Sequence, residues 1–134
     1  MLEKDIIQSR GFRNVYEGKK AIGFQVPIRT TYYRSVWMSQ LRPATVKVDG
    51  ETFEGDQITW TVNNETYEQK DFPNLGDVHW QLLDPAILTV KKSGGLKRGY
   101  HNVEVFYTYS ACYMPPKDDL KFGRWVSRKL TLAR

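Results

Sequence analysis

Residues 86–109 decide the fold of this chain and read AILTVKKSGGLKRGYHNVEVFYTY. Every second side chain of 86–90 is apolar, and a second alternating set, from His101 to Tyr109, returns after the three glycines. A period of two is typical of a strand with one face buried and the other in water. Because glycine adopts a positive φ without a steric clash, the segment predicts two strands of a hairpin joined by a glycine-rich turn.

The rest of the chain repeats this pattern, with a new strand about every 8–12 residues. The further strands that we expect are 5–8, 12–17, 21–29, 45–48, 51–53, 58–62 and 65–69. Turn dipeptides such as Asp49-Gly50 and Asn63-Asn64 separate them. No window of about 15 residues has sustained helical spacing. The chain is therefore predicted to be all-β, an antiparallel, jelly-roll-like β-sandwich with few or no helices and a C-terminal arm.

Two segments depart from the alternating pattern. Residues 71–85 are irregular and are expected to form a long connection across one end of the sandwich, with a helical turn before Pro85 as one option. Two prolines then separate the last residues, so we expect a β-sandwich domain at 1–116 and a C-terminal arm at 117–134. The arm is basic and rich in apolar and aromatic side chains, so it should pack on the domain or on a partner.

The charge of the chain is concentrated in this arm. Residues 117–134 hold six basic and two acidic side chains, a net of +4 out of the chain's +5. A nucleic-acid reader spreads its cations along a continuous face, so no nucleic-acid partner is expected. The sequence also has no apolar run long enough to span a membrane and no signal-peptide pattern. We therefore expect a soluble cytoplasmic protein with no membrane partner.

Few residues of the chain suit metal or acid–base chemistry. Cys112 is the single cysteine, and His79 and His101 are the two histidines. One thiol cannot form an internal disulfide, and this supply is thin for a zinc site. Cys112 is expected to be packed, and His101 to be a hydrogen-bonded structural histidine. We expect no catalytic residue, no metal ligand and no cofactor on this chain.

Aromatic side chains are the strongest candidates for recognition. Residues 31–39 combine phenol, indole, guanidinium and hydroxyl groups, and His79 and Trp80 lie in the irregular connection, where binding residues are frequent. Such rings stack on sugars or flat aromatic ligands, or pack against a protein partner. The six partner-facing or substrate-facing candidates are Tyr32, Tyr33, Arg34, Trp37, His79 and Trp80.

A family resemblance is carried by residues spread along the chain. They are Tyr32, Tyr33, Arg34, Ser35, Ser39, residues 46–50, Tyr67, Trp80, residues 88–90, residues 94–96, Gly99, His101, Val103, Val105 and residues 113–115. In this order and spacing the chain resembles the small β subunit of the bacterial C-glycoside deglycosidases. The resemblance covers nearly the whole chain up to Pro116.

The resemblance implies a two-subunit enzyme. In that family the α subunit is similar to a sugar isomerase barrel, holds a divalent, manganese-like metal and performs the chemistry, while the β subunit is a β-sandwich clamped onto it. The substrates are aromatic, flavonoid-type C-glucosides already oxidised at the sugar C3, and the carbon–carbon bond to the aglycone breaks by elimination. This implies a hetero-oligomer of several α–β pairs, with the six candidate residues facing the α subunit and the arm wrapped on α or on a second β copy.

Two other functions remain open at this point. A carbohydrate-binding β-sandwich module would use the same aromatic side chains as an exposed stacking platform. A stand-alone cupin-like enzyme would need two or more histidines near a carboxylate at strand ends, for which only His79 and His101 are available.

Overall fold

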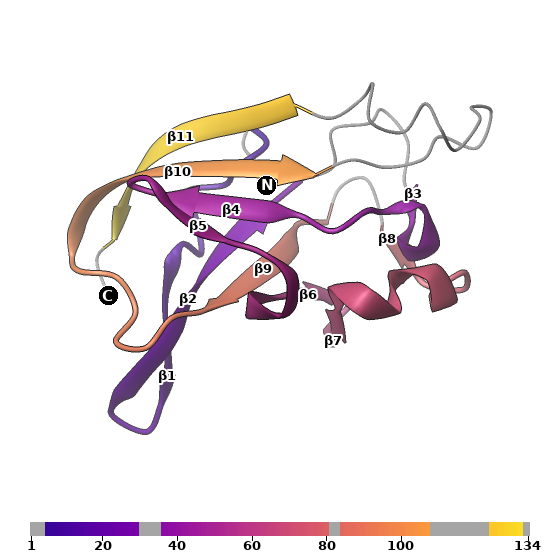
Figure 1. Ribbon diagram of the computed structural model, residues 1–134, viewed down its shortest axis with the longest axis horizontal. Helices are drawn as coiled ribbons and strands as arrows, with labels where there is room; N and C mark the ends of the chain where they lie inside the picture. The colour runs from indigo at the N-terminus through magenta and orange to yellow at the C-terminus, as the bar shows by residue number, and fades with distance from the viewer. Residues whose placement is uncertain (1–4, 30–35, 81–83, 108–123, 133–134) are drawn as a thin grey trace.

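The computed structural model describes residues 5–29, 36–80, 84–107 and 124–132. It consists mainly of antiparallel strands in two sheets that face each other across one core (Figure 1). The predicted all-β sandwich is confirmed. Within the described ranges the helical segments are three 3-10 helices, η1 (Met38–Gln40), η2 (Gly55–Gln57) and η3 (Gln69–Asn74). None of these helices is long and apolar enough to cross a membrane.

The two main sheets have five and four strands. The five-stranded sheet has the order β1 (Arg13–Glu17), β2 (Lys20–Ile28), β9 (Ala86–Lys91), β6 (Ile58–Val62) and β7 (Glu65–Glu68). The four-stranded sheet has the order β11 (Arg124–Leu132), β10 (Gly99–Tyr107), β4 (Thr45–Val48) and β5 (Glu51–Phe53). Two short strands, β3 (Val36–Trp37) and β8 (His79–Trp80), form a third, two-stranded sheet. In Figure 1 this small sheet lies at the right-hand end of the sandwich, opposite the β1–β2 hairpin.

The core lies between the inward faces of the two main sheets. Alternate side chains of β6, β9 and β10 are buried, as the period-two pattern predicts. β2 differs, because from Gly23 onward it is buried on both faces except at Gln25. Trp60 occupies the centre, where its ring meets those of Phe72, Trp80 and Tyr107 edge-on at centroid distances of 5.3, 5.6 and 5.7 Å. Edge-to-face contacts of buried rings add to the stabilisation from burial. This aromatic cluster joins both sheets to the end that carries β8.

Two predicted turns are confirmed by their backbone angles. Asp49 and Gly50 have φ values of 51° and 90° between β4 and β5, and Asn63 and Asn64 have 56° and 65° between β6 and β7. Positive φ at both central residues is the condition of the tight hairpin turn whose twist matches that of the flanking strands. Aspartate, asparagine and glycine tolerate this conformation best.

The expected hairpin of residues 86–109 is wrong. β9 pairs with β2 and β6 in one sheet, whereas β10 pairs with β4 and β11 in the other. The glycine-rich segment 92–98 therefore crosses between the sheets. Asn14 anchors it from β1, since its amide accepts from Leu96 N and donates to Leu96 O, both at 2.8 Å. The two strands each bury one face because they line opposite walls of the core.

The described part of the C-terminal segment, strand β11, belongs to the sandwich. β11 pairs with β10 along its whole length, from Gly99↔Leu132 to Tyr107↔Arg124. From β11, Arg128 Nη1 donates to the carbonyl oxygen of Ile7 at 2.8 Å. The expected first strand, 5–8, is reduced to an isolated bridge between Ile7 and Ile28. The predicted domain boundary at residue 116 and Cys112 lie outside the described residues.

Candidate functional site

The candidate site is built on the small sheet of β3 and β8. Trp37 pairs with His79 and Val36 with Trp80, and the pairing is extended by a 2.8 Å hydrogen bond from Met38 N to Val78 O. The chain leaves the strand conformation after Trp37 and turns into η1. One expectation is corrected here. Residues 71–85 are not uniformly irregular, because they contain part of η3 and all of β8.

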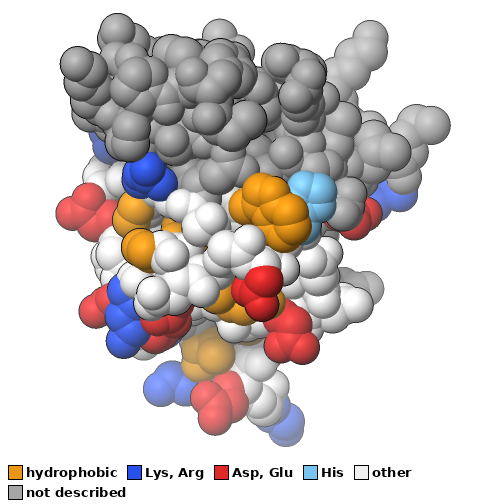
Figure 2. All heavy atoms as spheres, turned by 90° about the vertical axis from the view of Figure 1, so that its right-hand side faces the viewer, with side chains coloured by type: hydrophobic (Ala, Val, Ile, Leu, Met, Phe, Trp, Pro, Cys, Tyr) orange, Lys and Arg blue, Asp and Glu red, His pale blue; other side chains and the backbone are white. Residues whose placement is uncertain are grey.

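Trp37 and His79 form an aromatic pair at the surface. Their ring centroids are 4.6 Å apart with a tilt of 41°, and Trp37 is 44% exposed. Figure 2 shows a pale blue histidine side chain directly beside a large hydrophobic one on this face. Asn63, in the turn between β6 and β7, supports β8, since its Nδ2 donates to the carbonyl oxygen of His79 at 2.9 Å. The Trp37–His79 pair therefore presents two planar rings on a backbone that is hydrogen-bonded on both sides.

Trp80 does not share this surface. Its side chain is fully buried, packs against Trp60 and Tyr107, and donates from Nε1 to the carbonyl oxygen of Asp84 at 2.7 Å. The expectation that it faces a partner or substrate is therefore corrected, because a side chain in the core cannot reach either. Trp80 instead fixes β8 to the aromatic core, so that His79 is held beside Trp37.

The remaining three candidates are Tyr32, Tyr33 and Arg34. They lie outside the described residues, directly before β3 in the sequence. Their role stays a prediction.

Gln69 is a buried support of the site that sequence reasoning missed. Its Oε1 accepts from Ala44 N at 2.6 Å and from Trp60 Nε1 at 2.8 Å, and its Nε2 donates to Gly55 O at 3.2 Å. One amide thus joins η3, η2, β6 and the segment before β4. The sequence has no signal for this role, since a glutamine between a glutamate and a lysine resembles a surface position.

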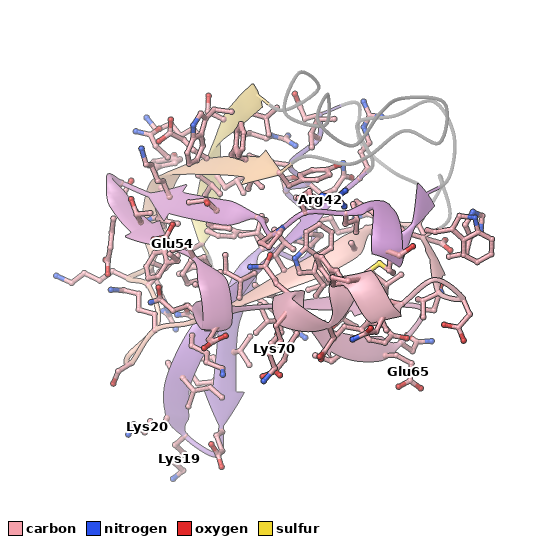
Figure 3. The ribbon with its side chains drawn as sticks, turned by 45° about the vertical axis from the view of Figure 1, so that its right-hand side comes forward. Lys19, Lys20, Arg42, Glu54, Glu65 and Lys70 are labelled. Atoms are coloured by element: carbon pink, nitrogen blue, oxygen red, sulfur yellow. The ribbon has the colours of Figure 1, made fainter. Side chains whose placement is uncertain are left out.

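A shallow cavity lies beside η1 and η3. It has a volume of about 420 Å³ and is lined largely by Leu41, Pro43, Phe72 and Pro73. In Figure 3, Arg42 appears above η3 and Lys70 below it. Arg42 Nη1 donates to the carbonyl oxygen of Leu41 at 3.2 Å, which holds its guanidinium close to its own loop. A hollow of this kind, with mainly apolar walls, is suited to receive side chains of a protein partner.

His101 is a structural histidine, as expected. Its Nδ1 lies 2.7 Å from Asp49 Oδ2, and its Nε2 lies 2.6 Å from the carbonyl oxygen of Lys97. The amide of Asn102 donates to Asp49 Oδ1 at 2.9 Å. That backbone hydrogen bond, followed by the one from His101, lowers the pKa of the Asp49 carboxyl below its ordinary value. The group ties the β4–β5 turn to β10 and to the crossing segment.

In the part of the chain that the structure describes, no group of three or more His, Cys, Asp or Glu side chains is placed to hold a metal ion.

Comparison with known proteins gives the family. The family model described as C-glycoside deglycosidase beta subunit matches residues 2–113. The chain is 46% identical over 116 residues to the C-glycoside deglycosidase beta subunit of Eubacterium cellulosolvens, which covers 86% of this chain and 79% of that protein. It is 28% identical over 85 residues to the protein of the same name from Arthrobacter globiformis, covering 63% and 62% of the two chains. The chain belongs to the C-glycoside deglycosidase beta subunit family.

Proposed function

We propose that this chain is the β subunit of a heteromeric C-glycoside deglycosidase and that it assists a catalytic α subunit. Membership of the β-subunit family supports a subunit role. The observation that carries the proposal is the Trp37–His79 pair, because an exposed tryptophan on a rigid support is typical of a protein contact. In the proposed assembly, this pair and the neighbouring Tyr32, Tyr33 and Arg34 face an α subunit similar to a sugar isomerase barrel.

The proposed reaction breaks the bond between the sugar C1 of a 3-oxo-glucosyl group and an aromatic carbon of a flavonoid-type aglycone. The 3-oxo group acidifies the C2 proton, and a base of the α subunit removes it. The electron pair forms a C1–C2 double bond while the bond to the aglycone breaks, and the aglycone carbon gains a proton. A divalent, manganese-like metal on the α subunit would supply Lewis acidity to the sugar oxygens.

In this proposal the residues of the β subunit bind and orient. The Trp37–His79 pair contributes flat apolar surface to the subunit interface, and its edge can contact the planar aglycone. The cavity beside η1 and η3 accepts an apolar side chain of the α subunit. Several α–β pairs then associate into the complete hetero-oligomer.

The test is association of the purified chain with the α subunit, measured by size-exclusion chromatography and calorimetry. Trp37→Ala is expected to weaken binding by about 2 kcal/mol or more, the scale of an interface hot spot. Tyr16→Ala is the matched control, since Tyr16 is 52% exposed on the β1–β2 hairpin, far from β3. A chain that elutes unchanged with α present, or a Trp37→Ala variant that binds like the control, would contradict the proposal.

The carbohydrate-module alternative predicts a different response. An isolated chain that binds sugars through exposed rings should change its tryptophan fluorescence on titration with sugar, without any α subunit. The subunit proposal expects no such change.

A further inference from the structure

The outer face of the four-stranded sheet carries aromatic and charged side chains in a regular array. On β10 the outward residues are Tyr100, Asn102, Glu104 and Phe106, and on β11 they are Trp125, Ser127, Lys129 and Thr131. Thr45 and Lys47 continue the array on β4. Tyr100 is 73% exposed and Trp125 is 43% exposed. This outer β10–β11 face lies on a different part of the molecule from the Trp37–His79 pair (Figure 1).

The aromatic side chains of this face are gathered at its two ends. At one end the ring centroids of Phe106 and Trp125 lie 5.5 Å apart, and Lys47 Nζ lies 4.7 Å from the Trp125 ring centroid. At the other end Lys129 Nζ lies 5.3 Å from the ring centroid of Tyr100. Each end therefore pairs an ammonium group with a ring, a contact that keeps these side chains close to the sheet.

Between the two ends lies a polar hollow. Its volume is about 600 Å³, and its lining includes Asn102, Glu104, Ser127 and Lys129. The face thus has an aromatic end, a polar centre and a second aromatic end. A surface with like ends and a polar centre is complementary to itself, which is the property of an interface formed by two identical patches.

We propose that two copies of this chain associate through the outer β10–β11 face, about a two-fold axis that lies between the two faces, perpendicular to β10 and level with Val103. Such an axis, in the plane between the copies, places position 100 of one copy opposite position 106 of the other, and position 102 opposite position 104. Tyr100 of each copy then meets the Phe106 and Trp125 rings of the second copy. Asn102 of each copy meets Glu104 of the second, so that an amide donates to a carboxylate.

The charges agree with this arrangement. Lys129 shares a row with Asn102, so it faces the row of Glu104 in the second copy. Lys47 shares a row with Glu104, so it faces the row of Asn102, beside which the Asp49 turn lies. Each lysine of one copy therefore meets a row that contains a carboxylate in the other. Opposite charges across an interface fix its register and speed association.

The size of the face limits the area that two copies can bury. Four strands about 4.8 Å apart and seven residues of about 3.4 Å each give roughly 19 Å by 24 Å. Two such faces would cover about 900 Å² in total, which is below the size of standard stable interfaces. The dimer is therefore expected to be reversible, and sensitive to salt because of its lysines.

The experiment is sedimentation of the full-length chain over a range of concentrations, at low and high salt. The apparent mass is expected to rise with concentration from monomer to dimer, and to fall with added salt. Glu104→Lys and Lys129→Glu should each weaken the dimer by about tenfold or more, because each places like charges opposite one another twice. Mixing the two variants should restore it, since the new lysine of one copy then faces the new glutamate of the other.

Two controls separate this contact from the proposed function. Tyr16→Glu adds a charge at an exposed aromatic position outside the face and should leave the dimer unchanged. Trp37→Ala should leave the dimer unchanged even where it weakens binding of the α subunit. A wild-type chain that stays monomeric at every concentration overturns the proposal, as does a mixture of the two charge variants that associates no better than either alone.

Discussion

Replacing Gln69 by leucine tests whether one buried amide holds the end of the sandwich that carries the candidate site. Gln69 is 4% exposed, and leucine fills a similar volume. The change removes the acceptor of two buried donors, Ala44 N at 2.6 Å and Trp60 Nε1 at 2.8 Å. Each buried donor left without a partner costs about 1–3 kcal/mol. Burial of the leucine side chain offsets about 1–2 kcal/mol of this. The free energy of unfolding of Gln69→Leu is therefore expected to fall by about 1–4 kcal/mol.

The measurement is urea unfolding followed by tryptophan fluorescence, with the free energy obtained by linear extrapolation. The matched control is Gln57→Leu, since Gln57 is exposed and its Oε1 accepts only a 3.2 Å bond from Glu54 N among the contacts described. The control should change stability by about 0.5–1 kcal/mol. If Gln69→Leu loses less than about 1 kcal/mol at an unchanged slope, the buried donors have other acceptors and the reasoning fails.

Two further substitutions test the turn and the sheet. Asp49→Asn keeps a side chain that tolerates positive φ but removes the charge. Because Asp49 is half-exposed, the substitution should lower the free energy of unfolding by only about 1 kcal/mol at neutral pH. Since the folded-state pKa of Asp49 is lowered, the difference in stability from wild type should be complete above the ordinary pKa of 3.8. In an unfolding series it should vanish as the pH falls through the lowered folded-state pKa, and a difference that persists in strong acid would be inconsistent with this. Gly23→Ala would place a Cβ 2.1 Å from the carbonyl oxygen of Val90, so β2 and β9 must shift, at a cost of about 1–3 kcal/mol in thermal or urea unfolding. Gly76→Ala is its control, because the new Cβ there has no neighbour closer than 3.9 Å, and equal losses in the two variants would show that the clash at Gly23 is relieved.

Local patterns predicted the strands of this chain better than their partners. The alternation in 86–91 and 99–107 identified the buried faces correctly, and Asp49-Gly50 and Asn63-Asn64 identified two hairpin turns. The pairing of β9 with β10 was predicted wrongly because a strand buries one face equally well beside its neighbour or across the core from it. The information that separates these cases lies in distant contacts, such as the hydrogen bonds between Asn14 and Leu96.

The same limit explains which site residues could be predicted. The sequence groups Trp37, His79 and Trp80 because their side chains are aromatic rings and because His79 and Trp80 fall in one expected loop. Once His79 and Trp80 belong to a strand, their side chains must point to opposite faces. The pairing of β3 with β8 puts Trp37 and His79 on the same face, and the packing of Trp80 against Trp60 and Tyr107 puts Trp80 inside. The residue that anchors to the core, Trp80, and the residue whose ring lies beside Trp37 at the surface, His79, are consecutive. Packing of Trp80 against Trp60 therefore directly sets the position of the His79 ring. Replacing Trp80 by a smaller residue should therefore disturb the Trp37–His79 pair, although neither residue of the pair is itself changed.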